Sequence, residues 1–264
     1  MTRSGVPLLQ HPLDEPSAFT AQALVTAVRS ERKLPFQLVP RICILEFDGD
    51  LADWLVKTGN ARFYENWACF HTIMHSIEVG GTTCGIIART IGGPYAVLIA
   101  EQLKASGAEL ILGLTSAGRV SRSLPLPSLV VVREAIRDEG TSYHYIAAGE
   151  SADSNAELVA VLAHGVRGLG LPVSTGRVWT TDAPYRETQQ QFDAHAAEGV
   201  LAVEMQAASL FAFSKATGMP VGVVALVSNA VDCMEDTFNK GPYELGQRLI
   251  EAMCCAGNRY LIGR

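Results

Sequence analysis

The stretch 199–232, GVLAVEMQAASLFAFSKATGMPVGVVALVSNAVD, predicts a strand, a helix and a second strand in succession. Its first five residues form an apolar run that is typical of a strand buried on both faces. Apolar side chains then recur at helical spacing from Ala207 to Thr217, and Gly218 follows where a helix C-cap belongs. Residues 221–227 form a second apolar run. We therefore expect two parallel strands whose polar ends form a pocket at one edge of a sheet.

The rest of the chain continues this alternation of strand and helix. Strands are expected at 42–45, 82–89, 110–118, 129–133 and 172–179, and helices at 51–58, 95–106, 156–169, 189–198 and 243–261. The alternation predicts the α/β class, with a three-layer α/β/α domain around a central, mostly parallel (mixed) β-sheet. Residues 1–37 are proline-rich with one helix-like segment, 17–32, and are expected to form an N-terminal arm; residues 38–264 are expected to form the domain.

Composition narrows the class of protein. Of 264 residues, 48% are hydrophobic and 18% charged, so a large core can be buried and disorder is not expected. The net charge of -6, with no Lys/Arg-rich block, argues against a nucleic-acid surface. No apolar run reaches the length of a membrane span, and the start of the chain lacks a signal-peptide pattern. Six cysteines without C-x-x-C spacing are expected to be reduced thiols of a cytoplasmic protein.

Several predicted strands end in polar or glycine-rich segments. Thr115-Ser116-Ala117-Gly118 ends the strand that begins at residue 110, and Arg89-Thr90-Ile91-Gly92-Gly93-Pro94 leads into a helix. Paired glycines let backbone amides approach a ligand, and a helix N-terminus adds partial positive charge. Since ligands bind beyond the carboxyl ends of strands in such sheets, these segments predict one shared site.

These segments, together with Asp182 and Glu204-Met205-Gln206 further along, resemble the purine nucleoside phosphorylase and uridine phosphorylase superfamily in content and order. The family pattern of Glu-Met-Glu, an alanine-rich helix and an apolar strand ending in a polar pair reads here as Glu204-Met205-Gln206 and Ser228-Asn229. The resemblance covers residues 38–262. It implies a phosphorylase/hydrolase-like fold and an enzyme that cleaves the N-glycosidic bond of a purine or pyrimidine nucleoside.

The resemblance also implies a role for particular residues. Asn229 and Asp232 are the catalytic candidates that meet the leaving base. The ribose would contact Glu204, Met205 and Gln206, and the base Asp182, Tyr185 and Arg186. The phosphate or water site would comprise Arg89, Gly92, Gly93, Thr115, Ser116 and Gly118. No metal and no cofactor are expected, apart from phosphate as a co-substrate, and Glu204→Ala is predicted to stop turnover while leaving the fold intact.

The sequence departs from the family pattern at three positions. Gln206 stands in place of a glutamate, so its contact with a hydroxyl carries no charge. The turn Asp48-Gly49-Asp50 lacks the family's phosphate arginine, and Leu112 takes the approximate place of a second one. Transfer to phosphate is the first reading of the resemblance; hydrolysis by a nucleosidase and non-catalytic nucleoside binding stay open as alternatives.

Two histidines are further candidates. Residues 67–78 alternate as in a strand, which would place His71 and His75 on one face, and His144 falls in a loop that lies over the site mouth in the resembled family. Each imidazole could face a pocket or be a structural histidine. Zinc is not expected, since no third ligand stands at suitable spacing. The arm and the resemblance favour a homo-oligomer, either a dimer or a trimer of dimers.

Overall fold

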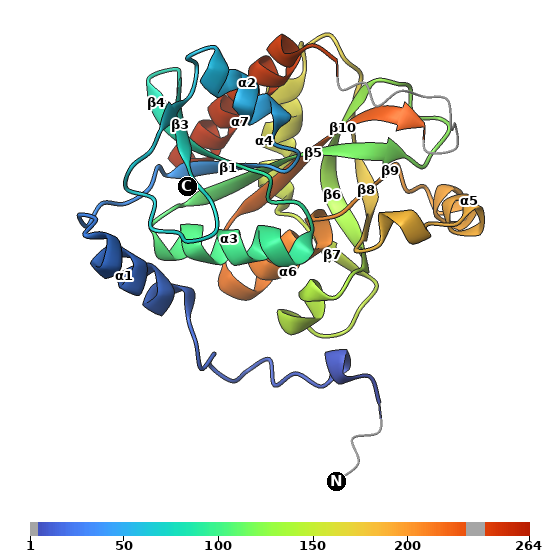
Figure 1. Ribbon diagram of the computed structural model, residues 1–264. Coiled ribbons are helices and arrows are strands. Elements are labelled where there is room, and N and C mark those ends of the chain that lie inside the picture. The colour runs from blue at the N-terminus through green and yellow to red at the C-terminus, as the bar shows by residue number, and fades with distance from the viewer. Residues whose placement is uncertain (1–4, 231–240) are drawn as a thin grey trace.

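The buried apolar runs assemble into a mixed sheet of ten strands among the described residues, with helices on both faces (Figure 1). The structure is a computed structural model that describes residues 5–230 and 241–264. The α/β class expected from the sequence, with helices on both faces of a central mixed sheet, is therefore confirmed.

The elements follow each other in strict order along the chain. The first half contains η1 (Pro7–Leu9), α1 (Ala21–Arg32), β1 (Ile42–Glu46), α2 (Asp50–Lys57), β2 (Arg62–Phe63), β3 (His75–Val79), β4 (Thr82–Ala88), α3 (Gly93–Ala105) and β5 (Leu110–Arg119). The second half contains β6 (Ser128–Asp138), η2 (Thr141–His144), β7 (Ser151–Asp153), α4 (Ala156–Val166), β8 (Val173–Thr181), η3 (Pro184–Arg186), α5 (Gln189–Ala197), β9 (Ala202–Glu204), α6 (Ala207–Thr217), β10 (Val221–Ala230) and α7 (Tyr243–Ile262).

Part of the sheet closes on itself. The order β10-β6-β8-β9-β5 is completed by a direct pairing of β10 with β5, while β1, β4, β3 and β2 extend outward from β5. Strand β5 can serve both parts because it is long: β1 pairs with it only as far as Leu114, and β9 joins it antiparallel at Gly118 and Arg119. Its middle, Thr115–Ala117, therefore lies where two sets of strands meet.

Two apolar cores fill the layers. One lies between the sheet and α3 with α6, and contains Phe47, Phe211 and Phe213; the other lies between the sheet and α2, α4 and α7. Alternate residues of β5 enter the two cores, since Ile111 faces the first and Leu112 the second. Burying both faces explains why the strands read as continuous apolar runs rather than alternating ones.

Most predicted elements agree with the structure. In the stretch 199–232, the helix agrees with its prediction and the first strand does not. Helix α6 has the predicted bounds, and Gly218 ends it in the left-handed conformation. Strand β9, however, has only three residues and runs antiparallel to β5, whereas β10 runs parallel to β5. Strands β9 and β10 therefore run in opposite directions on either side of β5, and the expectation of two parallel strands is wrong.

The N-terminal arm lies along the lower side of the domain in Figure 1 and leads into α1. Helix α1 begins at Ala21, later than predicted, because the Thr20 hydroxyl caps it by accepting from the Ala23 amide, 3.2 Å away. Val25 and Val28 pack this helix onto the domain. Within residues 5–230 and 241–264, no helix combines the length and the apolar character that a membrane span requires.

Candidate functional site

The sugar candidates lie against the middle of β5. After β9 the chain turns back, and Gln206, which is buried, brings its Oε1 to 3.2 Å from the Thr115 hydroxyl. That hydroxyl also lies 2.8 Å from the Ser116 carbonyl oxygen, so its single proton serves two acceptors. Met205, half-buried, precedes Gln206 at the same turn. The structure thus brings Thr115, Ser116, Met205 and Gln206 together.

The Glu204 side chain stabilises the turn between β9 and α6. It is 4% exposed, and its carboxylate accepts hydrogen bonds from the amides of Gln206 (2.7 Å) and Ala207 (2.9 Å) and from the Thr180 hydroxyl (2.5 Å). Burial raises the pKa of Glu204 to about 7, outweighing these hydrogen bonds, which lower it. The side chain therefore caps the start of α6 and positions Met205 and Gln206, rather than reaching outward to a sugar.

The paired glycines stand at the start of α3, as predicted. Gly92 has φ +86°, and a Cβ on Gly93 would collide with the Ser209 hydroxyl of α6, so the two helix starts touch only because residue 93 is glycine. Ser209 in turn donates to the buried carboxylate of Glu139 at 2.5 Å, which also accepts from the Ser142 amide at 3.0 Å. This chain of contacts joins α3, α6 and η2 beside Gln206.

One hydroxyl at this edge has no hydrogen-bond partner among the described residues. Thr90 follows β4, is completely buried, and its Oγ1 makes no hydrogen bond within the part of the chain that the structure describes. Unpaired buried polar groups are rare and costly, and they are retained where a ligand or a solvent molecule completes them.

Replacing Thr90 with valine is expected to raise the free energy of unfolding by about 1 kcal/mol, because the unpaired hydroxyl disappears. The same change is expected to weaken substrate use, seen as a higher KM for a nucleoside. Urea unfolding and initial-rate kinetics measure the two effects, with Thr90→Ser as the control that keeps the hydroxyl. A less stable Thr90→Val protein with unchanged kinetics would show that the hydroxyl only supports packing.

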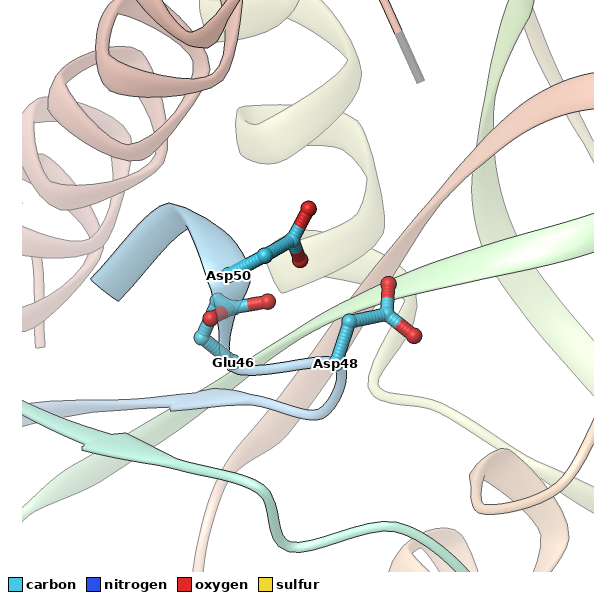
Figure 2. A group of neighbouring side chains, drawn as sticks. All are labelled: Glu46, Asp48 and Asp50. Atoms are coloured by element: carbon cyan, nitrogen blue, oxygen red, sulfur yellow. The ribbon is translucent and has the colours of Figure 1, made fainter. Parts of the chain in front are cut away.

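The turn from β1 into α2 is acidic (Figure 2). Glu46, Asp48 and Asp50 each place a carboxylate oxygen within 4.8 Å of the others. Glu46 is buried and accepts from the Gly49 and Ala52 amides, at 3.0 and 3.2 Å, so it caps α2; burial raises its pKa to about 7. Asp48 accepts instead from the Ser116 hydroxyl of β5, at 3.0 Å. The expectation of a metal-free site stays a prediction.

Two positions bear on the positive charge that a phosphate site needs: Leu112, where the resemblance expects an arginine, and Arg89, the candidate cation. Leu112 is fully buried in the apolar core, so this β5 position offers no charge. Arg89 adopts φ +60° and forms an ion pair with Asp53, with its side chain 58% exposed. Its side chain also lies directly over Gly49, where a Cβ would be 3.0 Å from the guanidinium carbon. Arg89 therefore reaches the predicted turn, near the carboxyl groups of Asp53, Glu46 and Asp50.

The base candidates lie on the far side of β8. A hollow of about 500 Å³, here called the β8 hollow, is lined by Asp182, Arg186 and Glu187, with arm residues Val6, Leu8 and Leu9 closing one side. Partial burial, with the charge of Asp138, raises the pKa of Glu187 to about 7. Tyr185 is 99% exposed and does not line this hollow, so its predicted stacking on a base has no support in this chain alone.

The remaining candidates are the catalytic pair and the first two histidines. Asn229 lies beside Gly118 across the β10–β5 pairing and is 9% exposed, with Oδ1 accepting from the Ser228 hydroxyl at 3.3 Å. Asp232, its predicted partner, lies outside the described residues. The strand predicted over 67–78 begins only at His75, so His71 is in a loop and does not share a strand face with it; that prediction is wrong.

His144 lies at the end of η2, and its ring contacts the ring of His11 in the arm at a tilt of 39°, with centroids 3.9 Å apart. It therefore joins the arm to the domain, and its predicted role at the site mouth stays a prediction. Sequence reasoning missed Thr90, Glu139 and Thr180, whose roles depend on burial. Their only signal was position, since each ends or follows a strand.

Comparison with known proteins gives the family. The profile of the Phosphorylase superfamily matches residues 41–252. The chain belongs to the Phosphorylase superfamily. The matched span runs from β1 into α7 and includes every element that carries a candidate residue.

Individual members of the Phosphorylase superfamily are similar at low identity. A guanosine phosphorylase of Halorubrum lacusprofundi is 27% identical over 147 residues, 56% of this chain and 61% of that protein. A uridine phosphorylase of Thermococcus kodakarensis is 25% identical over 58% of this chain and 60% of its own. A DeoD-type purine nucleoside phosphorylase of Colwellia psychrerythraea is 25% identical, covering 73% and 88%. The chain thus spans about three-fifths of the first two relatives, whose names differ in the base.

Proposed function

We propose that the protein cleaves the N-glycosidic bond of a nucleoside and transfers the sugar to water. The observation that carries this proposal is the hydrogen bond of 3.0 Å between the Asp48 carboxylate and the Ser116 hydroxyl. Ser116 belongs to the predicted nucleophile site, and a carboxylate beside it favours a neutral nucleophile over an anionic one.

Hydrolysis requires a general base that accepts a proton from the attacking water. Asp48 is half-buried and lies two residues before α2. A water bound to its carboxylate beside the Ser116 hydroxyl would lose a proton to the carboxylate as it attacks the sugar carbon, whose bond to the nucleobase breaks. A phosphate dianion at the same place would meet the carboxylates of Asp48 and Asp50; at 4 Å, each unit charge repels another by about 4 kcal/mol near a protein surface. Water meets no such repulsion.

The other side chains supply binding and orientation. Gln206 and Thr115 would hold the sugar hydroxyls through neutral hydrogen bonds, and Met205 would pack beneath the ring. Asn229 would donate to the leaving base, on which negative charge develops. The base itself is left open by this set, since neither Asn229 nor the β8 hollow distinguishes a purine from a pyrimidine.

Base release from inosine, guanosine, adenosine and uridine is expected to proceed at the same rate with and without inorganic phosphate. The product is expected to be the free pentose, measured as reducing sugar, and not a pentose 1-phosphate. Asp48→Asn is expected to lower kcat about 100-fold or more, the usual effect of removing a general base. Glu109→Gln, which changes an exposed carboxylate paired with Arg41, is the control for net charge and should leave the rate unchanged.

A strict requirement for phosphate would reject hydrolysis in favour of phosphorolysis, the second candidate. Two observations favour that alternative: Arg89 lies over Gly49 at the predicted phosphate turn, and the named relatives are phosphorylases. In that case Arg89→Ala would raise the KM for phosphate. Binding of nucleoside in calorimetry with no base released would reject both reactions.

A further inference from the structure

A second hollow, separate from the strand ends, lies between the arm and the domain. Its volume is about 710 Å³, within the range of about 300–1,000 Å³ that small-molecule sites occupy. One wall is formed by arm and α1 residues 17–24, the other by α3, and η2 closes one end. We call it the arm hollow; Asp182, a candidate for contact with the base, lines it, whereas none of the residues assigned above to the nucleophile or the sugar does.

The walls of the arm hollow are apolar and partly exposed. Phe19 is 70% and Leu98 38% exposed, and the half-buried Leu24 of α1 and the buried Val97 of α3 also line the hollow. At the η2 end, the rings of His144 and Tyr145 add aromatic surface. Such walls favour a flat, largely apolar ligand that covers Phe19 and Leu98.

Gln102 supplies an independent sign of a ligand. Its side chain lines the arm hollow but is only 2% exposed, and its Nε2 donates to the Leu98 carbonyl oxygen at 3.3 Å. Its Oε1 has no hydrogen-bond partner within residues 5–230 and 241–264. A buried carbonyl oxygen without a partner costs about 1–3 kcal/mol, and a ligand N–H would satisfy it.

The charges of the arm hollow select the ligand further. Glu101 and Asp182 both line it, and the described lining includes neither lysine nor arginine. Glu101 already accepts from the Tyr145 hydroxyl, at 3.1 Å, and Asp182 from the Gly140 amide, at 2.8 Å, and each carboxylate keeps lone pairs for further donors. An anionic ligand is disfavoured here, whereas N–H donors find several acceptors.

We propose that the arm hollow binds an uncharged or cationic heteroaromatic amine without a phosphate group, such as a free nucleobase. The ring would lie between Phe19 and Leu98, and an amino or ring N–H would donate to Gln102 Oε1. The site is distinct from the strand-end site and its occupancy does not depend on which acceptor the reaction uses.

Calorimetry with adenine as the probe tests the proposal, together with photolabelling by 8-azidoadenine and peptide mapping. Adenine is expected to bind, adenosine 5′-monophosphate at least about tenfold more weakly, and the label is expected within residues 17–24 or 94–102. Gln102→Leu is expected to raise the Kd for adenine about tenfold, equal to about 1.4 kcal/mol, and to leave base release unchanged. Gln22→Leu, an exposed glutamine of α1 that does not line the hollow, is the matched control.

Three results would overturn the proposal. The label could fall only on peptides that contain Thr115 or Met205, which would place adenine at the strand ends. The affinity of Gln102→Leu for adenine could equal that of the wild type. Finally, adenine could fail to bind while Leu98→Arg converts an oligomer to monomers in analytical ultracentrifugation, which would show that a second copy of the chain covers this surface.

Discussion

Glu204→Ala is expected to lower the free energy of unfolding by about 3 kcal/mol and to reduce base release at least about 100-fold. The alanine leaves the buried amides of Gln206 and Ala207 and the Thr180 hydroxyl without their acceptor. Each buried donor left unpaired costs about 1–3 kcal/mol, and the Glu204 side chain that accepts from these donors is only 4% exposed. Turnover falls because Met205 and Gln206 lose the group that fixes their turn.

Urea unfolding followed by circular dichroism measures the first effect, and base release at a temperature where the variant stays folded measures the second. Glu204→Gln keeps one acceptor oxygen and is expected to lose about 1 kcal/mol. Glu198→Ala, an exposed glutamate that follows α5, is expected to change stability by less than about 0.5 kcal/mol. Wild-type stability in Glu204→Ala would contradict the capping role and return Glu204 to the sugar.

This outcome differs from the prediction made from the sequence, which expects Glu204→Ala to leave the fold intact. The pattern Glu204-Met205-Gln206 identifies a functional turn but cannot assign a role to each member. The roles depend on Thr180, which lies 24 positions earlier and reaches Glu204 only through the pairing of β8 with β9. Long-range pairings of this kind leave no local signal.

The elements themselves were predictable where burial is uniform. Helix α6 and strands β1 and β10 have apolar spacing that matches their period, and Gly218 marks the helix end. The segment 67–74 failed for the opposite reason. It alternates like a strand, yet Tyr64 bonds to the Met74 carbonyl oxygen and leaves the residues between them to form an irregular loop, whose Phe70 and Ile73 are exposed.

The sequence shows that two expected arginines are absent, but it does not show which charged groups surround the site instead. Leu112 and the turn 48–50 show that the usual cations are absent from two positions. Only the structure shows that Asp48 bonds to Ser116 while Arg89 is paired with Asp53. The electrostatics of a site depend on which charged groups lie close together in the fold, and the spacing of residues in the sequence does not determine these neighbours.

The free energy of unfolding is expected to fall as the pH rises from about 4.5 to about 7. Glu46 and Glu204 are buried with pKa values raised to about 7, against an unfolded value of about 4.3. The folded state therefore holds these protons more tightly than the unfolded state does. Their stabilising contribution is complete below the unfolded pKa and is lost as the pH passes through the folded one, by up to about 3 kcal/mol for each group.

Urea unfolding at pH 5 and pH 8 measures the difference, and glutamine variants assign it. Glutamine cannot ionise, so Glu46→Gln and Glu204→Gln are each expected to flatten the pH dependence, and the double variant to remove the part that these two groups contribute. Glu187, whose pKa is also raised to about 7, contributes in the same window. Glu109→Gln is the control, because Arg41 lowers the pKa of this exposed carboxyl and its contribution lies below the window. If the single variants kept the full slope, the hydrogen bonds to the two carboxylates would outweigh burial, and both groups would be charged at neutral pH. Glu46 would then add a full charge to the turn that holds Asp48, which would strengthen the electrostatic case against phosphate.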